Sequence, residues 1–159
     1  MRQQYKLANR LWSQGKCLAR DAVHICDGRI YLLDVIYPKM WYGDTNAFGR
    51  VRIANVTRWF NLQSREKVFD NYSTIVRVTS TYRHVEYTVD GGGCDGHGSR
   101  GYIALRDSQA NEFRWFLFLS QSDPFDKIEF DDCEIVATST GGLVLRVPFL
   151  EPWNLRFVP

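Results

Sequence analysis

Short runs of β-branched and aromatic residues recur along most of the chain, separated by glycine, aspartate and asparagine. Branched and aromatic side chains fit the pleated surface of a sheet, and the separating residues favour tight turns. The pattern predicts an all-β chain built from antiparallel strands.

We therefore expect an antiparallel β-sandwich or a barrel-like meander of about 9–11 strands. Tyr5, Ala8 and Leu11 recur at helical spacing and Gly15 follows as a stop, which predicts a short helix over residues 3–13 before the strands. With 159 residues, 45% of them hydrophobic, the chain is predicted to form a single domain, 1–159, that needs no disulfides.

A propeller-like array of β-hairpins is the alternative architecture. Residues 23–31 and 128–136 both follow a strand, turn, strand pattern with acidic turn residues. A four-bladed propeller at roughly 40 residues per blade would fit this length. The rest of the sequence does not repeat the pattern well, so we favour the sandwich or barrel.

The firmest local prediction is a hairpin of residues 17–25 and 29–37, because Asp27-Gly28 tolerates the positive φ of a tight turn. Residues 112–120 are apolar on both faces, which indicates a central strand. The run 74–89 is expected to bend or turn near 79–81. The remaining predicted strands cover residues 49–60, 67–70, 102–106, 127–130, 133–139, 143–148 and 155–158, with a hairpin turn at 140–142.

Residues 90–101 contain six glycines in twelve positions, a composition that favours a loop. This Gly91–Gly101 segment is either a flexible connection or a functional loop. In the functional reading, its amides and Arg100 cradle a phosphate, or Cys94 and His97 serve as metal ligands or as a nucleophile and its base. The flanks match neither nucleotide-binding fingerprint and no second ligand pair is close in sequence, so we predict no metal and no cofactor.

The predicted compartment is the cytoplasm. The first ten residues contain no apolar run of the kind found in a secretory signal, and no stretch is long enough for a membrane span. The four cysteines are scattered along the chain and are expected to be reduced thiols: Cys17, Cys26, Cys94 and Cys133.

Charge is distributed unevenly along the sequence. Residues 1–60 carry ten Lys and Arg against four Asp and Glu, whereas residues 90–159 carry six against eleven. The segment 123–134 is the most acidic, and on a hairpin its carboxylates would form a ridge opposite Ile128 and Phe130. We assign partner binding to this ridge and to an aromatic loop over residues 38–44; the candidates are Asp123, Asp126, Glu129, Asp131, Asp132, Glu134, Trp41 and Tyr42.

These features favour a non-enzymatic domain that binds another protein with a basic surface, such as a bacterial immunity protein that neutralises a co-encoded toxin. Two alternatives remain open. The first is a nucleic-acid-binding or carbohydrate-binding β module that uses Trp41, Tyr42 and Trp59 with nearby arginines. The second is an enzyme or metal-binding protein built on Cys94, Asp95 and His97.

Overall fold

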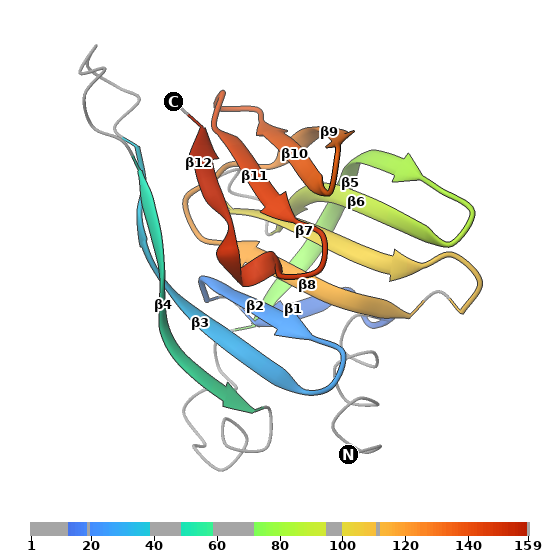
Figure 1. The fold of residues 1–159 in the computed structure, drawn as a ribbon, viewed down its shortest axis with the longest axis horizontal. Helices are drawn as coiled ribbons and strands as arrows, with labels where there is room; N and C mark the ends of the chain where they lie inside the picture. Colours follow the sequence, from blue (N-terminus) through green and yellow to red (C-terminus); the bar gives the residue numbers. More distant parts are fainter. Residues whose placement is uncertain are drawn as a thin grey trace.

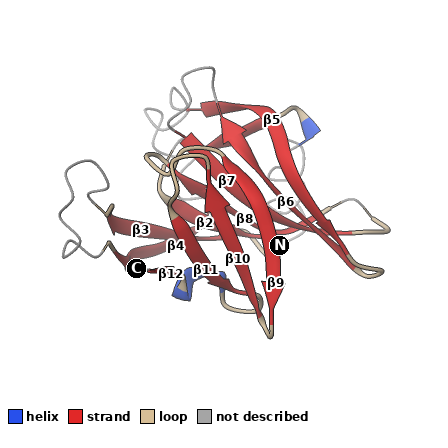
Figure 2. Cartoon of the chain, turned by 90° about the horizontal axis from the view of Figure 1, so that it is seen from above, coloured by secondary structure: helices blue, strands red, loops and turns tan. Residues whose placement is uncertain are grey.

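The chain folds into two antiparallel sheets in the computed structural model, and the all-β prediction is confirmed (Figures 1 and 2). A 3-10 helix, η2 (Pro152–Asn154), lies near the C-terminus. The helix expected over residues 3–13 lies outside the described residues apart from Ser13. The structure describes residues 13–18, 20–38, 49–58, 72–94, 100–110 and 112–158.

The larger sheet has eight strands in the order β1-β5-β6-β7-β8-β2-β3-β4. All neighbouring strands in it are antiparallel. Its strands are β1 (Lys16–Leu18), β2 (Ala22–Ile25), β3 (Arg29–Ile36), β4 (Arg50–Arg58), β5 (Tyr72–Arg83), β6 (Tyr87–Cys94), β7 (Arg100–Asp107) and β8 (Phe113–Leu119).

The smaller sheet packs across one face of the larger sheet and has the order β12-β11-β10-β9. The apolar inner faces of the two sheets share one buried core, which includes Leu117, Ile135 and Leu145. This two-layer arrangement is a sandwich and not a ring of propeller blades. The strands of the smaller sheet are β9 (Phe125–Asp131), β10 (Glu134–Ser139), β11 (Val144–Pro148) and β12 (Arg156–Val158).

The hairpin of β2 and β3 turns at Asp27-Gly28, as predicted. Gly28 has a φ of 91°, its amide donates to the Ile25 carbonyl at 2.9 Å, and the Asp27 carboxylate accepts from the Arg29 amide at 2.9 Å. The predicted first arm was too long, because Cys17 and Leu18 belong to β1, which pairs with β5. The central position of β8, between β7 and β2, is confirmed.

The chain does not turn near residues 79–81. Strand β5 continues through these positions with a shift in its register against β6 between Val78 and Ser80, and the chain turns at 84–86, where the His84 amide donates to the Tyr87 carbonyl at 2.8 Å. Thr81 is β-branched and favours the strand, and its hydroxyl donates to Asp90 on β6 at 3.0 Å.

The prediction of a loop over residues 90–101 is also wrong for its described part. Residues 90–94 lie in β6 and residues 100–101 in β7, with Gly93 paired to Gly101. A Cβ at Gly93 would lie 2.8 Å from Pro124 Cγ, and one at Gly101 would overlap the Asp123 carbonyl oxygen. These glycines therefore let the β8–β9 connection cross close to the larger sheet, which is a known use of glycine within strands.

The two long sides of the sandwich differ. On one side β9 packs against β5 and β6, and the Ile128 amide donates to Ser80 Oγ at 3.1 Å. On the other side β4 extends past the short strand β12 (Figure 1). The apolar side chains of Ile53 and Val56 on β4 remain 43% and 50% exposed there. Among the described strands, one side is closed by contacts between the two sheets and the other is open.

Candidate functional site

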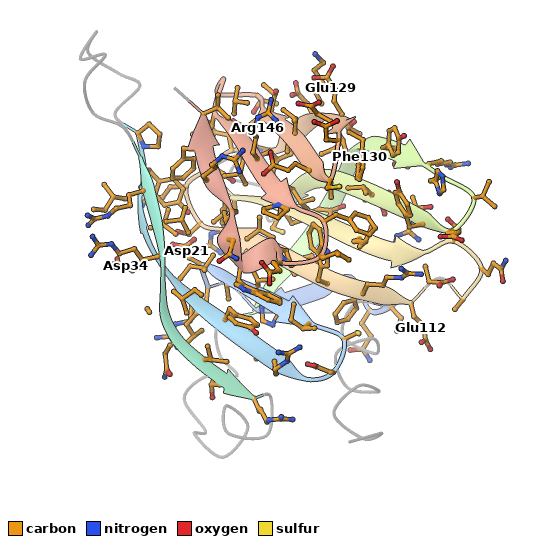
Figure 3. All side chains as sticks on the ribbon, viewed as in Figure 1. Asp21, Asp34, Glu112, Glu129, Phe130 and Arg146 are labelled. Carbon is orange, nitrogen blue, oxygen red and sulfur yellow. The ribbon has the colours of Figure 1, made fainter. Side chains whose placement is uncertain are left out.

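The β9–β10 hairpin presents most of the predicted carboxylates on the outside of the smaller sheet. On β9, Ile128 is buried and Asp131 is exposed. Glu129 is also exposed, on the outside of the smaller sheet (Figure 3). Two-residue alternation of a strand produces this division. We call the following set the acidic hairpin: Asp126, Glu129, Asp131, Asp132 and Glu134.

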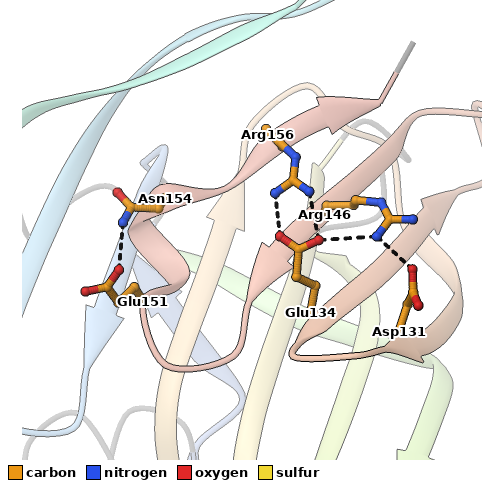
Figure 4. Close-up of polar contacts among 6 residues, drawn as sticks. All are labelled: Asp131, Glu134, Arg146, Glu151, Asn154 and Arg156. Carbon is orange, nitrogen blue, oxygen red and sulfur yellow. Dashed lines mark hydrogen bonds and ion pairs between the residues drawn. The ribbon is translucent and has the colours of Figure 1, made fainter.

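Arginines from β11 and β12 neutralise part of this charge (Figure 4). Arg146 Nη1 lies 2.8 Å from Asp131 Oδ2 and 3.2 Å from Glu134 Oε2. Arg156 forks onto Glu134, with Nη2 donating to Oε2 at 2.8 Å and Nη1 contacting Oε1. The hydrogen bond from Arg156, aided by Arg146, holds the pKa of Glu134 below its ordinary value.

Sequence reasoning missed these arginines because they lie 12 and 22 residues beyond Glu134. The register of β10 and β11, which the turn between them sets, could have revealed these arginines. A tight turn at 140–142 sets Val136 opposite Arg146, so outward positions on β10 and β11 become neighbours.

The acidic hairpin keeps a net negative charge after these pairings. Its five carboxylates face three basic side chains, those of Lys127, Arg146 and Arg156. Among the described residues, Asp126 and Asp132 form no ion pair. Asp132 occupies the hairpin turn with a φ of 53°, a conformation that aspartate tolerates better than most residues. The uncompensated charge therefore lies toward the two ends of β9.

The structure does not bring Asp123 into this group. Asp123 has a φ of 60° in the β8–β9 connection, and its carboxylate lies against Gly141 in the β10–β11 turn. There it lines a cavity of about 260 Å³ with Tyr37, Ser122 and other residues. Trp41 and Tyr42 lie outside the described residues.

Polar groups beside that cavity hold strand ends together. Asp21 Oδ1 accepts hydrogen bonds from the Tyr37 hydroxyl at 2.8 Å and from the Ser120 amide at 2.6 Å. Burial, followed by the negative charge of Asp21, raises the pKa of Tyr37. With its oxygens engaged in this way, Asp21 links the ends of β3 and β8.

A second cavity, of about 190 Å³, has an aromatic wall that includes Trp115 and Trp153, with Arg29 and Arg114 beside it. The Arg29 guanidinium lies 5.9 Å from the Trp153 ring centre and 2.7 Å from Asp27 Oδ2. Arg114 is 3.2 Å from Asp107. Both arginines are thus already paired with an aspartate.

Of the residues proposed for a thiol or metal site, the described structure contains only Cys94. Cys94 is buried at the end of β6, and Asp95 and His97 lie outside the described residues. Within the described ranges, no three His, Cys, Asp or Glu residues group as metal ligands. Cys26 and Cys133 are free thiols.

The other two histidines differ in environment. Burial lowers the pKa of His24 to about 3. His84 is exposed at the β5–β6 turn, where its ring stacks on Tyr87 with centres 4.6 Å apart.

No family model matches the sequence, and the comparisons with curated proteins and with solved structures likewise give no match. Among the described residues, none of the helices has the length and apolar character needed to cross a bilayer. Function is therefore inferred from the charges and shape of the described surface.

Proposed function

We propose that this chain is a cytoplasmic, non-enzymatic protein-binding domain of the bacterial immunity type, which neutralises a co-encoded toxin. In this proposal the acidic hairpin binds a basic surface of the partner. The observation that supports it most directly is the excess of exposed carboxylates on one hairpin, with Asp126 and Asp132 lacking ion pairs among the described residues.

The hairpin is well suited to binding without rearrangement. Its two strands are paired from Glu134↔Asp131 to Ser139↔Phe125, and Ile128 and Phe130 on its inner face pack on the core. Arg146 and Arg156 fix the orientation of the Glu134 carboxylate from the neighbouring strands. Carboxylates held in this way lose little conformational entropy on binding.

Charge on this surface would act mainly by raising the rate of association and by selecting the partner. A net negative surface attracts a basic enzyme over a distance near the Debye length, about 8 Å at physiological salt. The arginines among the carboxylates would repel cationic groups placed in the wrong register, which favours one orientation.

The test uses the product of the reading frame adjacent to this gene, purified and titrated by calorimetry. We expect a complex whose affinity falls as salt rises, together with rescue of growth when both proteins are produced in one cell. The double variant Asp126→Lys and Glu129→Lys should abolish both, because it reverses the charge at two exposed positions while leaving the Arg146 and Arg156 pairs intact.

The matched control is the double variant Glu86→Lys and Glu112→Lys, which changes the net charge equally at exposed positions outside the acidic hairpin. It should bind and rescue as the wild type does, and circular dichroism should show folded protein for both variants. Equal binding by the two double variants, or no binding by the wild type, would overturn the proposal.

A further inference from the structure

Strand β4 forms one edge of the larger sheet. It is nine residues long, and among the described strands it pairs only with β3. The backbone N–H and C=O groups on its outer edge have no ladder partner in any described strand. An exposed edge of this length can accept another strand.

The side chains of β4 divide into an apolar face and a basic face. Ile53 and Val51 lie opposite Leu33 and Val35 of β3, on the face that continues the core. Arg52 lies on the opposite face, in register with Asp34. The register shifts between Leu32 and Leu33, and beyond this shift Val56 lies opposite Tyr31 on the same apolar face.

The open side of the sandwich leaves this apolar face partly uncovered. Strand β12, which borders it in the smaller sheet, has only three residues and pairs only with β11 among the described strands. Ile53 and Val56 remain about half exposed. A further strand paired to β4 would extend the apolar layer over them.

The charges of β3 and β4 indicate which residue types an added strand would contain. The sequence of β4 contains Arg50, Arg52 and Arg58 and no carboxylate, and Arg58 lies in register with Arg29 of β3. In the two strands together, Asp34 is the only acidic residue. A second copy paired through β4 would bring six arginines into adjacent strands, which is unfavourable because like charges repel across a strand pair.

We propose that the edge of β4 binds an extended acidic segment of a partner protein, which adds to the larger sheet as a further strand. Alternate residues of that segment are apolar and cover Ile53 and Val56, and the residues between them are carboxylates that meet Arg50 and Arg52. This surface is separate from the acidic hairpin, since β4 and β9 lie on opposite long sides of the sandwich. The inference does not rest on the proposed function.

Ring packing near β4 favours a peptide over single-stranded nucleic acid. Nucleic acid binding of this type uses open aromatic faces on which bases stack. In the described structure, Tyr31 stacks on Trp153 with ring centres 4.3 Å apart and an interplanar angle of 10°. Tyr37 packs against Phe157 at 6.0 Å. These rings pack against one another, so their contacting faces are not available for stacking with bases.

The probe is a fluorescein-labelled synthetic peptide that alternates glutamate and valine and is as long as β4, and binding is measured by fluorescence anisotropy. A second peptide has lysine in place of each glutamate. We expect the acidic peptide to bind at least about tenfold more tightly than the basic one and to weaken as salt rises. Equal binding of the two peptides, or binding of neither, would overturn the proposal.

The variant Arg50→Glu and Arg52→Glu should reduce the affinity for the acidic peptide by at least about tenfold. Its matched control, Arg20→Glu and Arg83→Glu, makes the same charge change at exposed positions off β4 and should bind as the wild type does. Circular dichroism checks that both variants fold. Unchanged binding by the β4 variant would contradict the proposal.

Amide hydrogen exchange separates strand addition from simple charge attraction. Bound peptide should slow exchange in β4, because its amides gain hydrogen-bond partners, and should leave the β9 amides unchanged. Three results would overturn the proposal: no added protection in β4, a dimer joined through β4 without peptide in sedimentation experiments, and tighter binding of a labelled oligothymidine than of the acidic peptide.

Discussion

Two guanidinium nitrogens of Arg106 on β7 contact the same carboxylate oxygen of Asp90 on β6. Nε donates to Oδ2 at 2.7 Å, and Nη2 lies 2.6 Å from the same atom. Thr81 donates to Oδ1 at 3.0 Å. The Asp90 side chain is only 3% exposed, so this is a buried charge whose compensation comes from the two strands that flank β6.

Removing the arginine should therefore destabilise the fold strongly. Arg106→Ala leaves the Asp90 carboxylate buried without its counter-charge, and loss of one member of a buried pair costs about 3–5 kcal/mol. Urea unfolding at pH 7 measures the change. Lys127→Ala, which breaks the exposed pair with Glu129, is the control and should cost less than about 1 kcal/mol. Similar losses for the two variants would show that the Asp90 pair is not buried as described.

Replacing glycine by alanine in β6 and β7 should lower the stability of the fold by an amount that depends on which atoms the new Cβ meets. At Gly101 the new Cβ would overlap the backbone carbonyl of Asp123, which cannot move without shifting the β8–β9 connection. At Gly91 the nearest atom is Ile128 Cδ1 at 2.8 Å, the end of a flexible side chain. Overpacking of this kind costs about 1–3 kcal/mol, so Gly101→Ala should lie at or above the top of that range and Gly91→Ala near the bottom.

Thermal unfolding followed by circular dichroism compares these two variants with the wild type. The order of the melting temperatures is the decisive result. If Gly91→Ala melts below Gly101→Ala, the close crossing of the β8–β9 connection over Gly101 is not the main constraint.

Local chemistry explains which parts of the fold were predictable from the sequence. Asp27-Gly28 specified its own turn, and the doubly apolar run of β8 specified a central strand, because both signals depend on neighbouring residues alone. Gly91 and Gly93 resemble loop residues by the same local criteria. Their reason for being glycine is the approach of Ile128 and Pro124, which are more than thirty residues away.

The candidate site was likewise predictable only as far as neighbouring residues determine it, and the acidic hairpin shows this. Alternation along β9 was enough to place Glu129 and Asp131 outward. The partial neutralisation of the ridge was not visible in the segment 123–134, since Arg146 and Arg156 come from β11 and β12 and meet Glu134 only through strand register. Likewise, Asp123 belongs to the acidic segment in sequence but lies in the connection before β9.

Tyr37 should make stability depend on alkaline pH. Its raised pKa means that the folded protein keeps the phenol protonated at a pH where the unfolded chain, with an ordinary value of 10.0, releases the proton. The stability associated with the raised pKa is fully present below pH 10 and is lost as the pH rises above it. Tyr37→Phe should flatten the fall in unfolding free energy above pH 10, measured by urea titration. An unchanged alkaline slope would contradict burial of this hydroxyl.

His24 should make stability depend on mildly acidic pH. In the folded protein burial lowers its pKa to about 3, from an ordinary value of 6.5. Between these values the unfolded chain binds a proton that the folded protein does not bind. Stability is therefore unaffected above pH 6.5 and falls as the pH drops below it, by at most about 1.4 kcal/mol per pH unit.

The measurement is urea unfolding between pH 6.5 and 5, above the range in which carboxylates such as Glu134, with an ordinary pKa of 4.5 and a lowered value in the fold, begin to contribute. His24→Gln cannot titrate and should flatten the slope in this interval, even if it lowers stability at every pH. The matched control, His84→Gln, lies at the exposed β5–β6 turn and should keep the wild-type slope. A wild-type slope in His24→Gln would show that another group binds the proton, and that His24 does not remain neutral inside the larger sheet.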